Sequence, residues 1–174
     1  LRLFAKSNPP LLEWLQMDWP YLEAHSMASK LRALLPASYS PRACFHHYLS
    51  MGKSHRAQHL QGELVKPKKY FYVLRSIMAL RWLERGFGPV PIQFGRLLEA
   101  ALDEPTVAEQ IAELIERKRV SREVTPGPHW PVLDAFIDRE FARLEGVGPS
   151  LPVVRAEAEV LDDLFRGTLE EVWG

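Results

Sequence analysis

Basic side chains gather on two neighbouring segments, and they are the residues in this sequence whose types and spacing best suit chemistry. They are Lys53 and Arg56 on the first segment, and Lys68, Lys69 and Arg75, with Tyr72 among them, on the second. Lysine and arginine stabilise negative charge, lysine as a point charge and arginine as a two-pronged donor. These residues therefore predict a site for an anion, either a carboxylate of the same chain or a phosphate from outside.

Residues 66–85 form the element that must position the second group. Their sequence, KPKKYFYVLRSIMALRWLER, predicts a long helix that is apolar on almost every side. One narrow polar strip remains, because Lys68, Tyr72 and Arg75 fall within roughly 60° of one another. An unpaired buried cation costs several kcal/mol, so Arg75 needs a partner. Glu63 or Glu99 could fill that role if no ligand does.

The preceding segment predicts a two-sided helix from Ser40-Pro41 to about Leu60, since serine followed by proline is a common helix start. One side is polar and includes Lys53 and Arg56, and the other is apolar and includes Tyr48. A turn at Gly62 returns the chain antiparallel to residues 66–85. We therefore expect the two basic strips to lie side by side.

The remaining segments also have helical periodicity, and none alternates as a strand would. Further helices are predicted at 9–17, 25–35, 93–102, 106–122, 132–144 and 152–173, with Trp19-Pro20 and Pro36 ending the first two. The sequence therefore predicts an all-α fold of seven to eight helices around a buried central helix. We expect residues 1–103 to form the core and residues 104–174 to pack on it, within one domain.

Other acidic and histidine clusters give weaker signals. His55 and His59 have a spacing that can hold a metal on one helix face, but no third ligand is evident. Asp138 and Glu140 lie about 200° apart on a predicted helix, so two-metal catalysis is not predicted there. These carboxylates, like Asp162-Asp163, are expected to be solvated.

Composition limits the function classes. Lys plus Arg and Asp plus Glu both number 22, which argues against binding long nucleic acid through bulk charge. Cys44 is the one cysteine, so no disulfide can form within the chain, and a reducing cytoplasm is expected. No apolar run is long enough to span a bilayer, and no signal peptide is evident, so no membrane partner is expected.

Three segments resemble a known family. The segments NPPLLEWL, RACFHHYLSMGKSHRAQHLQGE and KPKKYFYVLRSIMALRWLE are similar to the C-terminal helical region of YcgL-type predicted nucleotidyltransferases, a branch of the DNA polymerase beta superfamily linked to RNA repair. The resemblance runs from about Leu3 to Leu98, and its most specific marks include His47-Tyr48 and Arg81-Trp82.

The resemblance implies a transfer of a nucleoside monophosphate from an NTP to an acceptor such as RNA. In such enzymes a palm with Gly-Ser and Asp-x-Asp holds Mg²⁺, and the helical part closes the nucleotide cleft. Neither motif occurs here, so the palm is expected outside these residues. The implied nucleotide-binding residues are His47, Lys53, Lys68, Lys69, Tyr72 and Arg75.

Two other functions remain open. Arg42 and His47 fit the Arg-x4-His pattern of HEPN ribonucleases, in which His47 would act as a base and Arg42 would steady the phosphate. Ala43 stands where those enzymes usually have a polar residue. The third possibility is a helical interaction module without catalysis, with an exposed apolar patch as its partner surface.

Overall fold

The computed structural model describes residues 1–17, 25–120 and 125–174, and these parts are helical without any strand. The elements are α1 (Arg2–Ala5), α2 (Pro9–Leu15), α3 (Met27–Ser38), α4 (Pro41–His59), α5 (Lys68–Glu84), α6 (Phe94–Ala101), α7 (Pro105–Val120), α8 (Pro131–Leu144), the 3₁₀ turn η1 (Gly148–Ser150) and α9 (Ala158–Trp173). A single antiparallel bridge among the described residues joins Val65 and Gly127. The prediction of an all-α fold is confirmed.

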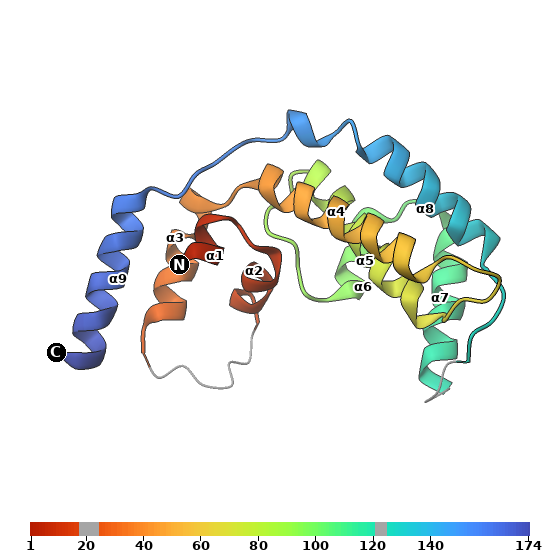
Figure 1. Cartoon of the computed structure of the whole chain (residues 1–174), viewed down its shortest axis with the longest axis horizontal. Helices are drawn as coiled ribbons and strands as arrows, with labels where there is room; N and C mark the ends of the chain where they lie inside the picture. The colour runs from red at the N-terminus through yellow and green to blue at the C-terminus, as the bar shows by residue number, and fades with distance from the viewer. Residues whose placement is uncertain (18–24, 121–124) are drawn as a thin grey trace.

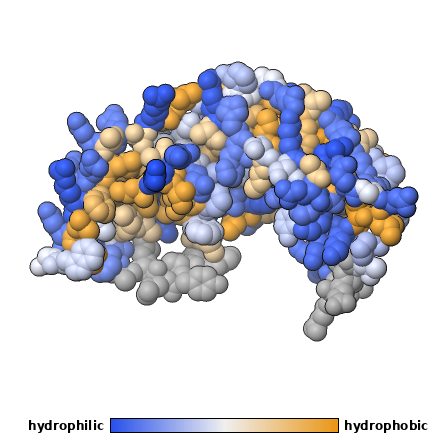
Figure 2. Space-filling model, in the orientation of Figure 1, coloured by the Kyte–Doolittle hydropathy of each residue, from blue (hydrophilic) through white to orange (hydrophobic). Residues whose placement is uncertain are grey.

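The helices form an arch (Figure 1). Helices α1, α2, α3 and α9 make one side, and α4 to α8 make the other, while the segment between α8 and α9 crosses the top. Helix α2 contacts both α3 and α4, and so it joins the two sides. Figure 2 shows a mostly hydrophilic face, with apolar residues gathered on the side formed by α1, α3 and α9.

Helix α5 is the buried centre, as predicted. It packs on α4, α6 and α8, and most of its residues from Tyr70 to Leu83 are buried. Gly52 of α4 allows the close approach of α4 to α5. A Cβ at this position would lie 2.8 Å from Ser76 Cβ and 2.9 Å from Phe141 Cζ, distances at which something would have to shift.

Local sequence signals account for two helix starts and one turn. The Asn8 side chain accepts a hydrogen bond from Leu11 N at 3.2 Å, and Ser40 Oγ accepts one from Ala43 N at 3.4 Å. Both caps precede a proline in the first turn, as expected. Gly62 has φ +88°, a left-handed conformation that suits glycine, in the turn between α4 and α5.

Two predicted boundaries are wrong. Helix α3 continues through Pro36 to Ser38, because a proline so near the end removes few bonds and Tyr39 N still donates to Leu35 O at 2.9 Å. Helix α9 begins at Ala158 instead of Pro152, since the backbone before it bonds to α4, where Arg42 N donates to Pro152 O. The predicted stop at Trp19-Pro20 and the predicted end at residue 122 lie outside the described residues.

Candidate functional site

Helices α2, α4 and α5 together line an open pocket of about 200 Å³, which we call the α2–α4–α5 pocket. Its walls are Pro9, Pro10, Glu13, His47, Tyr48, Met51, His55, Tyr72 and Arg75. Three of the six nucleotide-binding residues predicted from the sequence, His47, Tyr72 and Arg75, therefore meet at one place. Glu13 was not predicted there, although it stands as a charged residue in the otherwise apolar segment NPPLLEWL.

Glu13 is the acid that pairs with Arg75, so the alternative of a carboxylate from the same chain is confirmed, although the acid is neither Glu63 nor Glu99. Arg75 Nη2 lies 2.9 Å from Glu13 Oε1, and the Tyr48 hydroxyl donates to the same oxygen at 2.5 Å. Among the described residues, no donor bonds to Glu13 Oε2. The carboxylate therefore has one oxygen held by Tyr48 and Arg75 and one oxygen without a hydrogen bond from the described residues.

Arg75 has further partners on the segment after α5. Its Nη1 donates to Ile92 O at 2.9 Å, and its Nη2 donates to Pro91 O at 3.1 Å. The guanidinium thus ties α5 to that segment and to α2. The guanidinium holds the Glu13 carboxylate in place, and that carboxylate neutralises the positive charge of Arg75.

Tyr48 secures the other side of Glu13. Burial raises the pKa of Tyr48 above its usual value, and the adjacent Glu13 carboxylate raises it further. The hydroxyl therefore keeps its proton and remains a donor to Glu13. His47 packs edge-on against the Tyr48 ring, with centroids 6.2 Å apart, and is itself exposed at the pocket.

An aromatic column forms the wall beside Tyr72, whose residue surface is 47% exposed. The His55 ring lies 5.5 Å from the Tyr72 ring and 5.9 Å from the His59 ring, measured between centroids. Lys69 Nζ lies 5.1 Å from the Tyr72 centroid and 3.3 Å from His59 Nε2. Partial desolvation and the Lys69 charge lower the pKa of His59, which favours a neutral ring that accepts from Lys69.

The two histidines of this column stack on each other, which is a packing arrangement. Across residues 1–17, 25–120 and 125–174, no three His, Cys, Asp or Glu side chains gather closely enough to hold a metal ion. The described residues therefore do not fit a Mg²⁺ site, and no chemical step is assigned to Mg²⁺ on them. His55 Nδ1 is buried and has no hydrogen-bond partner among the residues that the structure describes.

Lys53 and Arg56 face away from α5, so the expectation that the two basic strips lie side by side is wrong. Lys53 pairs with Glu145, and Arg56 pairs with Asp138 of α8. Helix α8 packs on both α4 and α5 and carries Asp138, and Glu145 directly follows its last residue. Lys68 is exposed at the first position of α5, one residue before Lys69.

The structure does not bring Arg42 and His47 together. The Arg42 guanidinium donates to the carbonyls of Leu151 and Pro149, whereas His47 lines the α2–α4–α5 pocket. Arg42 therefore holds the segment after η1 against α4. This geometry argues against the paired roles that a HEPN-type ribonuclease would require.

A buried ionic network occupies the other half of α5, and the prediction that Glu140 is solvated is wrong. Glu140 is 2% exposed and accepts from Arg81 Nε at 2.7 Å and from Arg143 Nη2 at 3.1 Å. Arg81 also donates to Glu104 at 2.6 Å. Burial opposes ionisation of Glu140, but the two guanidinium groups outweigh it and lower its pKa. The presence of Arg81 in an apolar helix indicates from the sequence that a buried ion pair exists. It does not indicate that Glu140 is the partner.

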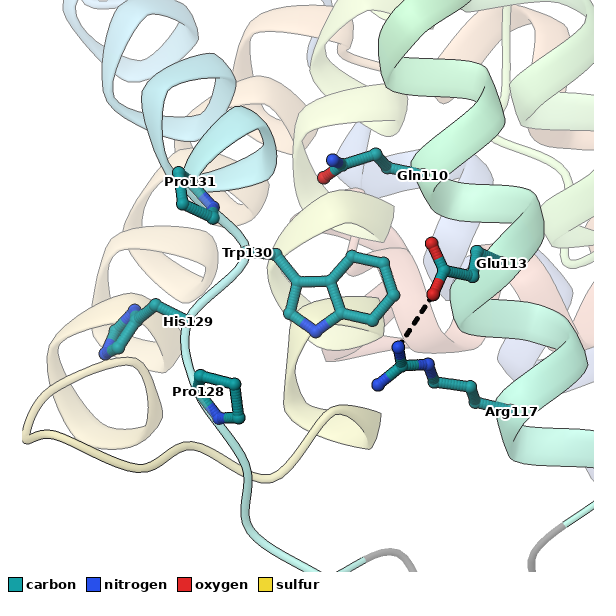
Figure 3. A pocket seen from close by; sticks show the side chains of 7 residues that line it. All are labelled: Gln110, Glu113, Arg117, Pro128, His129, Trp130 and Pro131. Carbon is teal, nitrogen blue, oxygen red and sulfur yellow. Dashed lines mark hydrogen bonds and ion pairs between the residues drawn. The ribbon is translucent and has the colours of Figure 1, made fainter.

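A second hollow of about 210 Å³ lies between α7 and the start of α8 (Figure 3). The Trp130 ring lies at its centre, with the Arg117 guanidinium 4.8 Å from the ring centroid and bonded to Glu113 at 2.7 Å. None of the site residues predicted from the sequence lines this hollow.

Helices of the kind that cross a membrane, long and apolar, are not found in the part of the chain that the structure describes. No solved structure matches this chain. The chain is similar to the uncharacterized protein YcgL of Bacillus subtilis (strain 168), with 39% identity over 174 residues that cover 99% of this chain and 67% of that protein.

Residues 1–167 match RlaP, described as the RNA repair pathway DNA polymerase beta family. The match extends well beyond Leu98, where the resemblance read from the sequence ended, so the likeness to the family is not confined to residues 3–98. With most of its residues matched, the chain belongs to the RNA repair pathway DNA polymerase beta family.

Proposed function

We propose that this chain is the helical part of a nucleotidyltransferase that moves a nucleoside monophosphate from an NTP to an acceptor. One observation carries the proposal. The nine residues that line the α2–α4–α5 pocket all come from the three segments NPPLLEWL, RACFHHYLSMGKSHRAQHLQGE and KPKKYFYVLRSIMALRWLE. The three segments that carry the family resemblance thus build one open cavity.

The size and walls of the pocket suit one end of a nucleotide. Its volume of about 200 Å³ is below the roughly 300–1,000 Å³ of pockets that hold drug-sized ligands. The exposed face of Tyr72 offers a stacking surface, and Lys68 and Lys69 stand at the nearby start of α5. In this arrangement the ring stacks on Tyr72, and the lysines neutralise phosphate charge as pyrophosphate leaves.

The catalytic carboxylates and Mg²⁺ belong to a palm domain outside these residues in this proposal. The side chains of this chain orient and neutralise the NTP, and they do not activate the acceptor, for which RNA is the candidate that the family description favours. If the reading frame continues upstream, it should encode a strand-rich segment with Gly-Ser and Asp-x-Asp. A continuing frame without both motifs would contradict the palm assignment.

A calorimetric titration of the whole protein with NTPs tests the proposal. Stacking of a base on an aromatic ring contributes about 1–3 kcal/mol, so Tyr72→Ala should weaken NTP binding by roughly 5- to 150-fold. Phe165→Ala on α9 is the matched control, because Phe165 is also an exposed aromatic residue, 51% exposed, and lies outside the pocket. Equal affinities of the Tyr72→Ala variant and the wild type would contradict the proposal.

Substitutions of lysine separate the pocket from the rest of the surface. Lys69→Ala should weaken NTP binding, since it removes a positive charge beside Tyr72. Lys53→Ala should leave binding unchanged, because Lys53 pairs with Glu145 beside α8. If Lys53→Ala weakens binding as much as Lys69→Ala does, then the nucleotide does not lie at the α2–α4–α5 pocket.

A further inference from the structure

The α2–α4–α5 pocket contains a cation, but that cation is already neutralised. Arg75 forms an ion pair with Glu13 Oε1 and donates to the carbonyls of Pro91 and Ile92. A phosphate that entered this pocket would displace Glu13 or lie beside its negative charge. The electrostatics therefore favour an uncharged group inside the pocket, with phosphates outside it.

The pocket walls favour a flat ring. Pro9, Pro10 and Met51 provide apolar surface, and Tyr72 provides an aromatic face. Aromatic faces stack on nucleobases of any sequence, because every base has a π-face. The base is therefore the part of a nucleotide that matches these walls.

Glu13 adds a hydrogen-bonding preference to this shape. Its Oε1 already accepts from the Tyr48 hydroxyl and forms an ion pair with Arg75 Nη2 at 2.9 Å. Its Oε2 accepts no hydrogen bond from the described residues and belongs to a residue that lines the pocket. An ionised carboxylate only accepts hydrogen bonds, so the matching group on the ligand is an N–H donor.

We propose that the α2–α4–α5 pocket binds the nucleobase and selects bases with an exocyclic amino group through Glu13 Oε2, an inference that rests on the proposed nucleotidyltransferase function. Adenine, cytosine and guanine carry such a group. Uracil has a carbonyl oxygen where cytosine has its amino group, and its ring N3–H lies between two carbonyl oxygens that the carboxylate would repel. In this scheme Glu13 contacts the substrate, whereas Tyr48 and Arg75 are positioning residues that hold Glu13.

Nucleotide analogues test the selection in the unaltered whole protein. We compare CTP with UTP, and ATP with purine riboside triphosphate, which lacks the amino group, by calorimetry. A hydrogen bond to a charged group corresponds to roughly 10- to 100-fold in affinity. Each amino-bearing nucleotide should bind more tightly by about that factor, and equal affinities within both pairs would overturn the inference.

The variant Glu13→Gln should reduce the preference for CTP over UTP. The glutamine carbonyl oxygen can keep the bonds from Tyr48 and Arg75, which turns the amide N–H₂ toward the pocket in place of Oε2. A donor there matches the uracil carbonyl, so the ratio of CTP to UTP affinity should fall below that of the wild type. Glu63→Gln is the matched control, since Glu63 is exposed and does not line the pocket, and it should leave the ratio unchanged.

The outcomes of these experiments test the base selection separately from the proposed nucleotidyltransferase function. If no NTP binds, both the proposed function and the base selection fail. If NTPs bind and Tyr72→Ala weakens them, but Glu13→Gln keeps the wild-type CTP to UTP ratio, then the base selection fails and the function stands. The analogue comparison uses unaltered protein, so it decides the matter even if Glu13→Gln does not fold.

Discussion

Two arginines on α5 lie within a few turns of each other and make different kinds of site. The Arg81 side chain is 9% exposed and bonds to Glu140, whose side chain is 3% exposed, and to Glu104. The Arg75 side chain is 23% exposed and bonds to Glu13, whose side chain is 17% exposed. Both are arginine–carboxylate pairs within one chain, and both join α5 to another helix.

The two sites differ in whether the carboxylate can accept a further hydrogen bond. Both oxygens of Glu140 accept from arginines, Oε2 from Arg81 and Arg143 and Oε1 from Arg143 at 3.4 Å. Glu13, in the wall of a cavity, has one oxygen that accepts no hydrogen bond from the described residues. A buried carboxylate whose two oxygens are both hydrogen-bonded stabilises the fold. A rigidly held carboxylate with an unbonded oxygen at a pocket is able to bind a ligand.

Removing Glu140 should produce the largest effect. Glu140→Ala leaves Arg81 buried without its main partner, and breaking a buried pair in this way costs about 3–5 kcal/mol. Urea unfolding followed by circular dichroism measures the loss. The control is Glu145→Ala, an exposed partner of Lys53 at 58% side-chain exposure, for which we expect about 0–1 kcal/mol. If Glu140→Ala lowers the free energy of unfolding by less than about 1 kcal/mol, then the site of Arg81 is not the more important of the two for stability.

Arg75→Ala should have the second largest effect on stability, and it should affect NTP binding more than Glu140→Ala does. It removes one pair with a carboxylate and two bonds to carbonyls in a partly open site, so we expect a loss of about 1.5–3 kcal/mol in urea unfolding. NTP affinity should also fall, because Glu13 loses a positioning partner. A protein that is destabilised as much as Glu140→Ala but binds NTP normally would show that Arg75 is structural like Arg81.

His129 provides a third charged contact and a pH dependence. Its Nδ1 lies 2.9 Å from Asp134 Oδ2, and its Nε2 lies 2.8 Å from Gly62 O. Both neighbours are acceptors, so the doubly protonated ring fits best. The Gly62 carbonyl, and then Asp134, raise the pKa of His129.

A raised pKa means that the folded state binds the proton more tightly than the unfolded chain does. The stabilisation is fully present below the unfolded pKa of about 6.5 and is lost as pH rises through the higher folded value. Because the His129 side chain is 32% exposed, we expect at most about 1 kcal/mol. Urea unfolding of the wild type and of His129→Asn at pH 5.5 and 8.5 measures this pH-dependent stabilisation. An equal pH dependence in both proteins would contradict this role.

Arg117 should show the smallest effect. Its ion pair with Glu113 joins two side chains that are 58% and 54% exposed, and such surface pairs contribute about 0–1 kcal/mol. Thermal unfolding of Arg117→Ala should therefore differ little from that of the wild type. A loss near that of Arg75→Ala would mean that the contact of Arg117 with Trp130 matters more than its exposure indicates.

The sequence predicted the buried central helix, the caps at Asn8 and Ser40 and the turn at Gly62, because each depends on periodicity or on residues close along the chain. It did not predict the start of α9, which depends on bonds between Arg42 and the segment before that helix. The candidate site was predicted in part. His47, Tyr72 and Arg75 meet in one pocket, but Lys53 faces α8.

The sequence by itself determined that the chain is helical and that cations within apolar helices need anionic partners, since propensity, periodicity and the cost of burying charge are local properties. Only the tertiary structure decided which acids those partners are. Glu13 reaches Arg75, and Glu140 reaches Arg81, through the packing of distant helices. The same packing placed Glu13 in the wall of a cavity, because α2, α4 and α5 meet there without filling the space between them.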